Sequence, residues 1–373
     1  SNSEIHFDMH EICLVNDDLN CSNIHLNRAI KLDPRSKYYA SSDSLTAYKE
    51  LLDRAKRSVE KENYTLALSD YDDIIVRFSN RALPHYEKGI ILMRLNDFDN
   101  AIKNFQIARS LNPNKDLYTN AIISIAQRIG KEADQYAKIK DYSSAIPKYL
   151  EAISYYPEFI QAYFNLSRCF YSLGDFDAAK KTLLESLEID SNQAQALKML
   201  GDIYRKENDY VSAVDFYKKA VKVKSNYYKA YYSLATLLML TDDLDNAKFY
   251  LEKVIDIKYD YYKAHETLGI INMRLGRDDE ALENFLNTIN VTSKSYKANY
   301  LLAAIYNAKN NQAVAKSYAE EALRIKKNCA PAFFYLGIAE KELGNIAAAK
   351  DAFESAKRDK DWRASAQYEL DLI

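Results

Sequence analysis

A spacing of 34 residues between alanines constrains the fold of this chain more than any other feature. Nine alanines follow that spacing, with a single longer step of 44 residues: Ala67, Ala101, Ala145, Ala179, Ala213, Ala247, Ala281, Ala315 and Ala349. Self-similarity at a fixed period of this length is typical of repeat proteins, in which each repeat contacts only its neighbours. A globular chain of 373 residues would be expected to divide into domains, because a single core stops growing at about this size. A repeat array does not need one large core and can extend without such a division.

Glycines and prolines follow the same spacing when Ala194 is taken as position 1 of a repeat. Glycine recurs at position 8 (Gly89, Gly201, Gly269, Gly337) and position 15 (Gly174, Gly276, Gly344), and proline at position 32 (Pro34, Pro113, Pro157). Glycine at position 15 can adopt the left-handed conformation that ends a helix, and proline stops the following helix. Inside a helix, at position 8, glycine costs about 1 kcal/mol relative to alanine. Close packing of two helices is therefore the expected reason for it.

Apolar residues between these points have helical spacing. Leu197, Leu200 and Ile203 share one face of a first helix, and Val214 and Tyr217 share one face of a second. Only eight glycines and six prolines are present, which argues against a loop-rich or β-rich fold. The sequence predicts a stack of helical hairpins.

The residues Leu200-Gly201-x2-Tyr204, Ala213-x3-Tyr217 and Ala220 resemble the tetratricopeptide repeat. The resemblance implies an all-α, right-handed solenoid of 34-residue helix-turn-helix repeats. Nine clear repeats are expected, at 48–81, 82–115, 126–159, 160–193, 194–227, 228–261, 262–295, 296–329 and 330–363.

The ends and interruptions of the array define the remaining organisation. Residues 1–47 are expected to hold a degenerate repeat, which keeps only Ala29 and Pro34 of the signature, followed by a Ser- and Tyr-rich connector at Lys37–Thr46. Two repeats then fill 48–115, an insertion fills 116–125, seven repeats fill 126–363, and a capping helix fills 364–373. The insertion either lengthens one first helix, which the lack of any breaker except Gly130 favours, or offsets two lobes.

Charge and cysteine content exclude several classes of protein. The 51 basic and 53 acidic residues show no electrostatic footprint for nucleic acid. Four cysteines are too sparse for a disulfide framework, and no apolar run approaches the ~20 residues that span a bilayer. The opening Ser1-Asn2-Ser3 looks like a tag-cleavage scar, which would have removed any native signal or anchor. The compartment is therefore not determined, with the cytoplasm slightly favoured.

No catalytic constellation is found, so we predict neither an enzyme nor a cofactor. Gly-rich phosphate loops, Walker motifs and HExxH are absent from the sequence, and neither Cys169 nor Cys329 has a histidine beside it. His6, His10 and Cys13 have helical spacing and could share a face, as a metal site needs. Without a paired CxxC, packing inside the degenerate repeat is the preferred interpretation, and no metal site is predicted.

The resemblance also implies that first helices line a concave groove, with positions 2, 5, 9 and 12 facing the ligand. Aromatic anchors among polar groups suit a peptide or helix of a partner protein. The candidate partner-binding residues are Phe164, Arg168, Lys198, Asp202, Lys229, Tyr232, Lys263, Lys297, Tyr300 and Phe334.

Three of these lysines, Lys229, Lys263 and Lys297, share position 2. Lysine in the first turn opposes the helix macrodipole by about 0.3–1 kcal/mol, which indicates an acidic ligand. The alternative is that the lysine stems cover neighbouring tyrosines. The predicted function is a protein–protein interaction scaffold; the alternatives are a regulatory or substrate-recruiting arm of a larger enzyme or assembly, and a self-associating structural protein.

Overall fold

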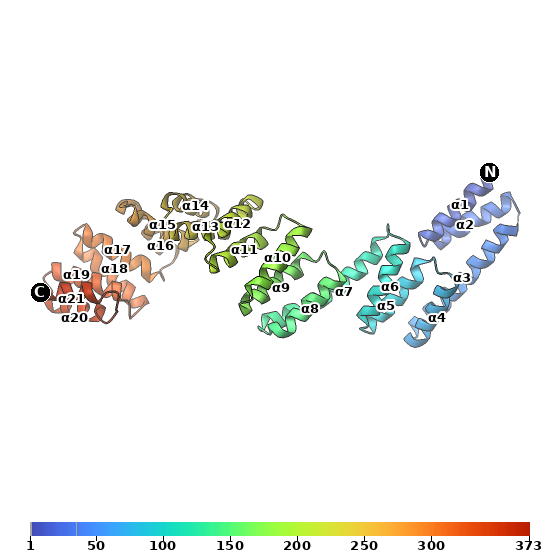
Figure 1. The fold of residues 1–373 in the computed structure, drawn as a ribbon, viewed down its shortest axis with the longest axis horizontal. Coiled ribbons are helices and arrows are strands. Elements are labelled where there is room, and N and C mark those ends of the chain that lie inside the picture. Colours follow the sequence, from blue (N-terminus) through green and yellow to red (C-terminus); the bar gives the residue numbers. More distant parts are fainter. Residues whose placement is uncertain (1, 35) are drawn as a thin grey trace. The chain divides into compact units, whose positions relative to one another are not determined.

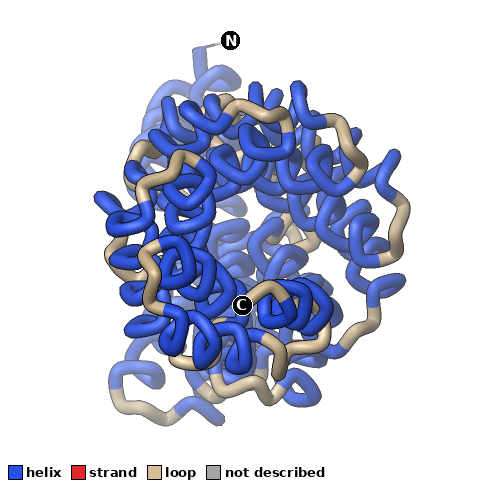
Figure 2. Tube along the Cα trace, turned by 90° about the vertical axis from the view of Figure 1, so that its left-hand side faces the viewer, coloured by secondary structure: helices blue, strands red, loops and turns tan. Residues whose placement is uncertain are grey.

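The structure is a computed structural model that describes residues 2–34 and 36–373. This described part consists of helices joined by short loops and contains no strand (Figure 2). The prediction of an all-α repeat solenoid is therefore confirmed. The chain divides into two compact units, which we call the N-terminal unit, up to Ile189, and the C-terminal unit, from Asp190. Figure 1 labels the helices along the chain.

The helices of the N-terminal unit are α1 (Asn2–Val15), α2 (Leu19–Leu32), α3 (Ser36–Glu60), α4 (Tyr64–Arg77), α5 (Ala82–Arg94), α6 (Phe98–Leu111), α7 (Asp116–Lys138), α8 (Tyr142–Tyr155), α9 (Ile160–Leu173) and α10 (Phe176–Ile189). Those of the C-terminal unit are α11 (Ala194–Lys206), α12 (Tyr210–Val223), α13 (Tyr228–Leu240), α14 (Leu244–Ile257), α15 (Tyr262–Arg274), α16 (Asp278–Val291), α17 (Tyr296–Ala308), α18 (Gln312–Ile325), α19 (Ala330–Glu342), α20 (Ile346–Ala356) and α21 (Arg363–Asp371).

The segment predicted as a connector, Lys37–Thr46, is instead helical and forms the first part of α3. Tyr38 and Leu45 in this part pack in a core cluster with Leu14 of α1 and Leu26 of α2. The second part of α3 belongs to a different cluster, shared with α4. The serines and tyrosines indicated a loop, but the apolar residues among them keep one face of a helix that serves two hairpins.

The ten extra residues at 116–125 lengthen a helix. They are continuous with the first helix of the next repeat, so that α7 spans 23 residues. Ile122, Ile125 and Ile129 lie along one face of α7 and pack against Phe105 of α6. The insertion is therefore accommodated by additional turns of an amphipathic helix with a continuous buried face.

Small residues allow the two helices of each hairpin to approach closely. All nine alanines of the 34-residue series are completely buried. A Cβ atom added to Gly89, Gly201, Gly269 or Gly337 would lie only 2.5–2.6 Å from a ring atom of Phe105, Tyr217, Phe285 or Phe353, respectively. The aromatic ring of the second helix thus occupies the space that a side chain at position 8 would take, which confirms close packing as the reason for these glycines.

The turn between the helices of a hairpin has the same backbone conformation in every repeat. Its residue at position 15 has a positive φ, between 56° and 83°, at Asp17, Glu62, Asn96, Lys140, Gly174, Asn208, Asp242, Gly276, Asn310 and Gly344. Only three of these ten residues are glycine, and asparagine and aspartate tolerate the left-handed region better than most others. Asp17 shows that the degenerate first repeat shares this turn although it lacks most of the sequence signature.

The chain ends in a short helix that covers the last repeat. Ala366 of α21 is completely buried, and Leu370 and Ile373 pack with it against Ala349 and Phe353 of α20. The apolar side chains of α21 therefore pack onto the second helix of the preceding repeat.

Three buried tyrosines and the half-buried Tyr155 donate their hydroxyls to carboxylates, which makes the fold sensitive to alkaline pH. The donor–acceptor distances are 2.5–2.8 Å for Tyr118–Asp17, Tyr149–Asp134, Tyr155–Asp99 and Tyr217–Asp202. Burial, and then the adjacent carboxylate, raises the pKa of each phenol above its ordinary value. The folded chain therefore favours neutral phenols more strongly than the unfolded chain does.

We expect this contribution to be complete below the unfolded tyrosine pKa of about 10 and to be lost as the pH rises above it. The sign follows because the unfolded state then releases protons that the folded state retains. Urea unfolding at pH 8 and pH 11, with hydrogen exchange resolved for α11 and α12, would measure the loss. Tyr217→Phe should reduce the alkaline loss in that hairpin; an equal loss in both proteins would contradict the assignment.

Candidate functional site

A cleft of about 380 Å³ lies in the C-terminal unit, where the starts of α15 and α17 come together beside α13. Its lining residues are Tyr232, Tyr262, Lys263, Glu266, Thr292, Lys294, Ser295, Tyr296 and Lys297. We call it the lysine cleft, because it combines three ammonium groups with a single carboxylate. The side chains that line the cleft therefore carry an excess of positive charge.

The repeat places the lysines of this cleft at the beginning of helices. Tyr262 and Tyr296 are the first residues of α15 and α17, so Lys263 and Lys297 occupy the first turn and are exposed. Within the described residues, neither lysine has a carboxylate within ion-pair distance or an aromatic ring beneath its ammonium group. Their repulsion from the positive helix ends is therefore not relieved inside the chain.

Lys229, the third lysine of this series, differs from the other two. Its ammonium group lies 6.0 Å from the ring centroid of Tyr228, at the limit of a cation–π contact. Lys229 is also not among the residues that line the cleft. The alternative interpretation, in which a lysine covers a neighbouring tyrosine, thus fits Lys229 better than Lys263 or Lys297.

The one carboxylate of the cleft is already hydrogen-bonded. The Ser295 hydroxyl donates to Glu266 at 2.5 Å and accepts from the backbone N–H of Ala298 at 3.1 Å, so that Ser295 caps α17. Tyr232 is also held in place, because its hydroxyl lies 3.3 Å from that of Thr267 and its ring packs edge-on against Tyr261. The walls are therefore fixed by internal contacts before any ligand arrives.

Two predicted aromatic residues pack inside the C-terminal unit. Tyr300 is half-buried against Ala322, Cys329 and Ala332, and burial, with a smaller effect of Cys329, raises the pKa of Tyr300 to about 12. Phe334 lies against Phe353 and Trp362, with ring centroids 5.8 and 5.0 Å away. The structure thus assigns Phe334 to the closure of the last repeat and leaves Tyr300 a neutral, partly accessible phenol.

Lys198 and Asp202 bind each other within α11. Their side chains form an ion pair of 2.6 Å, and Asp202 also accepts the Tyr217 hydroxyl from α12 at 2.8 Å. This pair links the two helices of one hairpin. Its charges are therefore neutralised internally, and the structure does not bring them to the lysine cleft.

The remaining two predicted residues, Phe164 and Arg168, lie on α9 in the N-terminal unit. Arg168 is exposed and lines a separate cavity of about 400 Å³, together with Asp134, Asn165 and Cys169. Asp134 accepts from Tyr149 at 2.5 Å and from Asn165 at 2.8 Å. Burial raises the pKa of the Cys169 thiol to about 11, so this cysteine remains a thiol at neutral pH.

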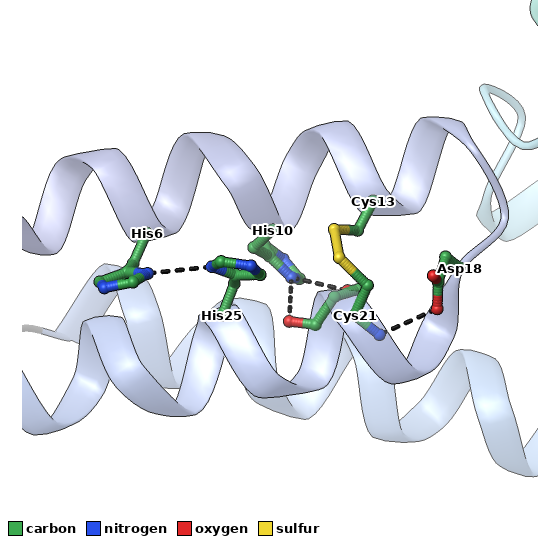
Figure 3. The surroundings of a disulfide bond; sticks show 7 residues. His6, His10, Cys13, Asp18, Cys21 and His25 are labelled. Atoms are coloured by element: carbon green, nitrogen blue, oxygen red, sulfur yellow. Dashed lines mark hydrogen bonds between the residues drawn. A yellow bond between two sulfur atoms is a disulfide. The ribbon is translucent and has the colours of Figure 1, made fainter.

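The structure changes the interpretation of the first hairpin, where His6, His10 and Cys13 were weak metal candidates. Cys13 forms a disulfide with Cys21, and the potential ligand atoms of Cys13, Cys21 and His25 all lie within 4.8 Å of one another (Figure 3). His10 is instead buried, with Nδ1 2.7 Å from the Ser22 hydroxyl. Sequence reasoning therefore missed Cys21 and His25, whose i, i+4 spacing on α2 was the available signal.

Among the described residues, no helix combines the length and the apolar character that crossing a bilayer requires. Sequence comparison with curated proteins finds none that is significantly similar to this chain.

Three sequence models, each described as a tetratricopeptide repeat, match the chain. One covers residues 138–203, the second covers 194–227, 228–261 and 296–329, and the third covers 331–359. Together they extend over half of the sequence.

Solved structures are similar in fold. The C-terminal part of a TPR repeat-containing protein from Cytophaga hutchinsonii is 18% identical, with a TM-score of 0.54, over 65% of this chain and 99% of that one. PilF of Pseudomonas aeruginosa is 18% identical, with a TM-score of 0.51, over 57% of this chain and 97% of that one. YrrB, described as a TPR protein with an unusual peptide-binding site, is 24% identical, with a TM-score of 0.44, over 49% of this chain and 95% of that one.

From these structures we take the fold alone. The repeated helical hairpins, the turn shared by ten repeats and the matching family models agree with one another. Such repeats typically serve as non-catalytic scaffolds for protein–protein interaction. The chain belongs to the tetratricopeptide repeat family.

Proposed function

We propose that this chain is an interaction scaffold that binds an acidic peptide segment of a partner protein at the lysine cleft. The observation that supports the proposal is the imbalance of charge there. Lys263, Lys294 and Lys297 line the cleft, and the only carboxylate among its lining residues, Glu266, is bonded to Ser295. A peptide that brings two or more carboxylates would supply the partners that these ammonium groups lack.

The tyrosines of the cleft favour a peptide over a small anion. Tyr232, Tyr262 and Tyr296 line the cleft together with the lysines, and tyrosine provides large contact area at low cost in side-chain entropy. Since the walls are held by the contacts of Glu266 and Tyr232, binding requires little ordering of the receptor. The expected ligand therefore has acidic residues interspersed with apolar or aromatic ones.

The direct test uses fluorescence anisotropy with a labelled peptide of alternating glutamate and leucine, and a glutamine-for-glutamate peptide as its neutral counterpart. We expect the acidic peptide to bind and Lys263→Glu with Lys297→Glu to weaken it by about tenfold or more, which corresponds to at least ~1.4 kcal/mol. Raising the salt concentration should weaken binding further, because the contacts are exposed to solvent.

The matched control is Lys222→Glu with Lys350→Glu, which changes the net charge equally at two exposed lysines on α12 and α20. Equal loss of binding in both double variants would show a non-specific effect of charge and contradict the proposed cleft. If neither double variant changed peptide binding, the binding site would lie on another surface of the protein.

The tyrosine contribution is tested separately by Tyr232→Ala combined with Tyr262→Ala, because both side chains line the cleft. We expect weaker peptide binding without loss of helicity in circular dichroism. A pull-down from source-cell lysate tests for a natural partner. A protein that the wild-type chain recovers should be lost with Lys229/Lys263/Lys297→Glu, and an unchanged yield of that protein would argue against this surface.

A further inference from the structure

The hairpin of α1 and α2 brings together a group of potential metal ligands from both helices. Cys13 lies near the end of α1, and its Cα is 5.7 Å from that of Cys21 in the first turn of α2. His25 follows Cys21 by four residues, which puts both side chains on the same face of α2. The sulfur atoms of both cysteines and a ring nitrogen of His25 lie within 4.8 Å of one another.

The surroundings of His25 suit a metal ligand. Its Nδ1 lies 2.9 Å from Nδ1 of His6, and Figure 3 shows its ring between His6 and the two sulfur atoms. If His25 donates from Nδ1 to His6, its Nε2 carries a lone pair. A ligating histidine usually donates its other ring N–H in this manner to a neighbouring acceptor. His6 is then a positioning residue for His25.

We propose that, when the disulfide is reduced, the thiolates of Cys13 and Cys21 and the imidazole of His25 bind Zn²⁺, with a solvent molecule as the fourth ligand. Two thiolates and an imidazole are a typical donor set for this ion. With Zn–S about 2.3 Å and Zn–N about 2.0–2.1 Å, tetrahedral ligand atoms lie roughly 3.3–3.8 Å apart. These distances are shorter than the 4.8 Å within which the three ligand atoms already lie.

The site has a path for the ion. Cys13 is buried at 4% exposure, whereas Cys21 and His25 are only half-buried. One side of the cluster is therefore open to solvent, where an ion can enter and a water molecule can complete the coordination. The inference does not depend on the peptide-binding proposal, because the lysine cleft lies in the other unit.

The disulfide is the alternative state of the same residues, so the site depends on redox conditions. A dithiol reductant gives two electrons and two protons to the Cys13–Cys21 bond, which yields two thiols and leaves the reductant as a disulfide. Zn²⁺ then displaces the two thiol protons to solvent. Oxidation to the disulfide removes both thiolates and is expected to release the ion.

The first experiment compares the oxidised and the phosphine-reduced wild-type chain under anaerobic conditions. We expect the reduced chain to bind one equivalent of Zn²⁺, measured with a chromophoric chelator, and the oxidised chain to bind none. Co²⁺ as a substitute should show thiolate-to-metal charge-transfer absorption only in the reduced chain. Equal metal content in the two states would overturn the proposal, without reliance on any variant.

Variants then test the ligand set. Cys13→Ser or Cys21→Ser should each lower the affinity of the reduced chain by about 100-fold or more, and His6→Gln by about tenfold through His25. Cys169→Ser, at a buried thiol elsewhere in the same unit, is the matched control and should change nothing. An equal effect of Cys169→Ser, or no effect of His25→Gln, would overturn the assignment of these ligands.

Discussion

Replacing Phe285 by alanine is expected to destabilise the hairpin of α15 and α16 by about 3–5 kcal/mol. Phe285 is completely buried and packs in a cluster with Ala281, Ala298 and Leu302, so it joins its own hairpin to the next repeat. Removal of the ring leaves a cavity that rigid helices close only in part. Because a solenoid gains stability from neighbouring interfaces, the loss should extend to the contact with α17.

The glycine opposite this ring provides a second test of the same packing. A Cβ on Gly269 would lie 2.6 Å from the Phe285 ring, so Gly269→Ala alone should cost about 1–3 kcal/mol through overpacking. In the Phe285→Ala background the ring is absent, and the better helix propensity of alanine, worth about 1 kcal/mol, should make Gly269→Ala neutral or stabilising. The two changes are therefore expected to be strongly non-additive.

Hydrogen exchange resolved for α15 and α16, together with urea midpoints, would measure this cycle. Local protection is the better observable, since long repeat arrays can depart from two-state unfolding. Glu283→Ala on the exposed side of α16 is the control and should remain within about 0.5 kcal/mol of the wild type. Additive effects of Gly269→Ala and Phe285→Ala would show that the two residues do not compete for the same space.

Replacing Asp17 by alanine is expected to loosen the first hairpin by about 2–3 kcal/mol, the cost of leaving a buried donor without its charged acceptor. The Asp17 side chain is 4% exposed. It accepts from the Tyr118 hydroxyl at 2.6 Å and from Lys115 at 3.1 Å. Alanine would remove both contacts and would also occupy a left-handed position, where φ is 57°, less readily than aspartate.

Asp17→Asn separates these contributions. Asparagine keeps the size, tolerates the left-handed backbone and can still accept from Tyr118, but it loses the ion pair with Lys115. We expect a loss of about 1 kcal/mol, in the range of one partly exposed ion pair. Asp8→Ala, at an exposed residue of α1, should leave hydrogen exchange in α1 and α2 unchanged. If Asp17→Ala also left hydrogen exchange in α1 and α2 unchanged, the contacts of Asp17 with Tyr118 and Lys115 would not contribute to stability.

Sequence reasoning predicted the repeat well because its signals are local. The spacing of the alanines, the glycines at position 8 and the terminal helix follow from interactions within one hairpin or between neighbours. The helical connector in α3 was missed because its serines and tyrosines outweighed Tyr38 and Leu45, whose burial depends on the first hairpin. The contacts of Asp17 with α7 could not be predicted, since no periodicity relates residues 101 positions apart.

The candidate site was predicted only in part, for a similar reason. Lys263 and Lys297 were predicted because they share position 2 of the repeat. Lys294 and Ser295 lie in the loop between α16 and α17, and the repeat pattern did not identify them. The pairing of Lys198 with Asp202, by contrast, was available from their i, i+4 spacing. Whether a charge is free for a ligand depends on its surroundings in space, and this information is largely missing from a single sequence.

The turn between α1 and α2 contacts residues 112–118, and this contact has a consequence for synthesis on the ribosome. Asn112 donates to the carbonyl of Val15 at 2.8 Å, and Lys115 reaches Asp17 across 98 positions of sequence. At about 5–20 residues per second, the surface that receives this turn is translated roughly 5–20 s after the turn itself. The nascent first hairpin must therefore persist without its docking surface for that interval, and covalent or metal cross-linking of its two helices would help it to do so.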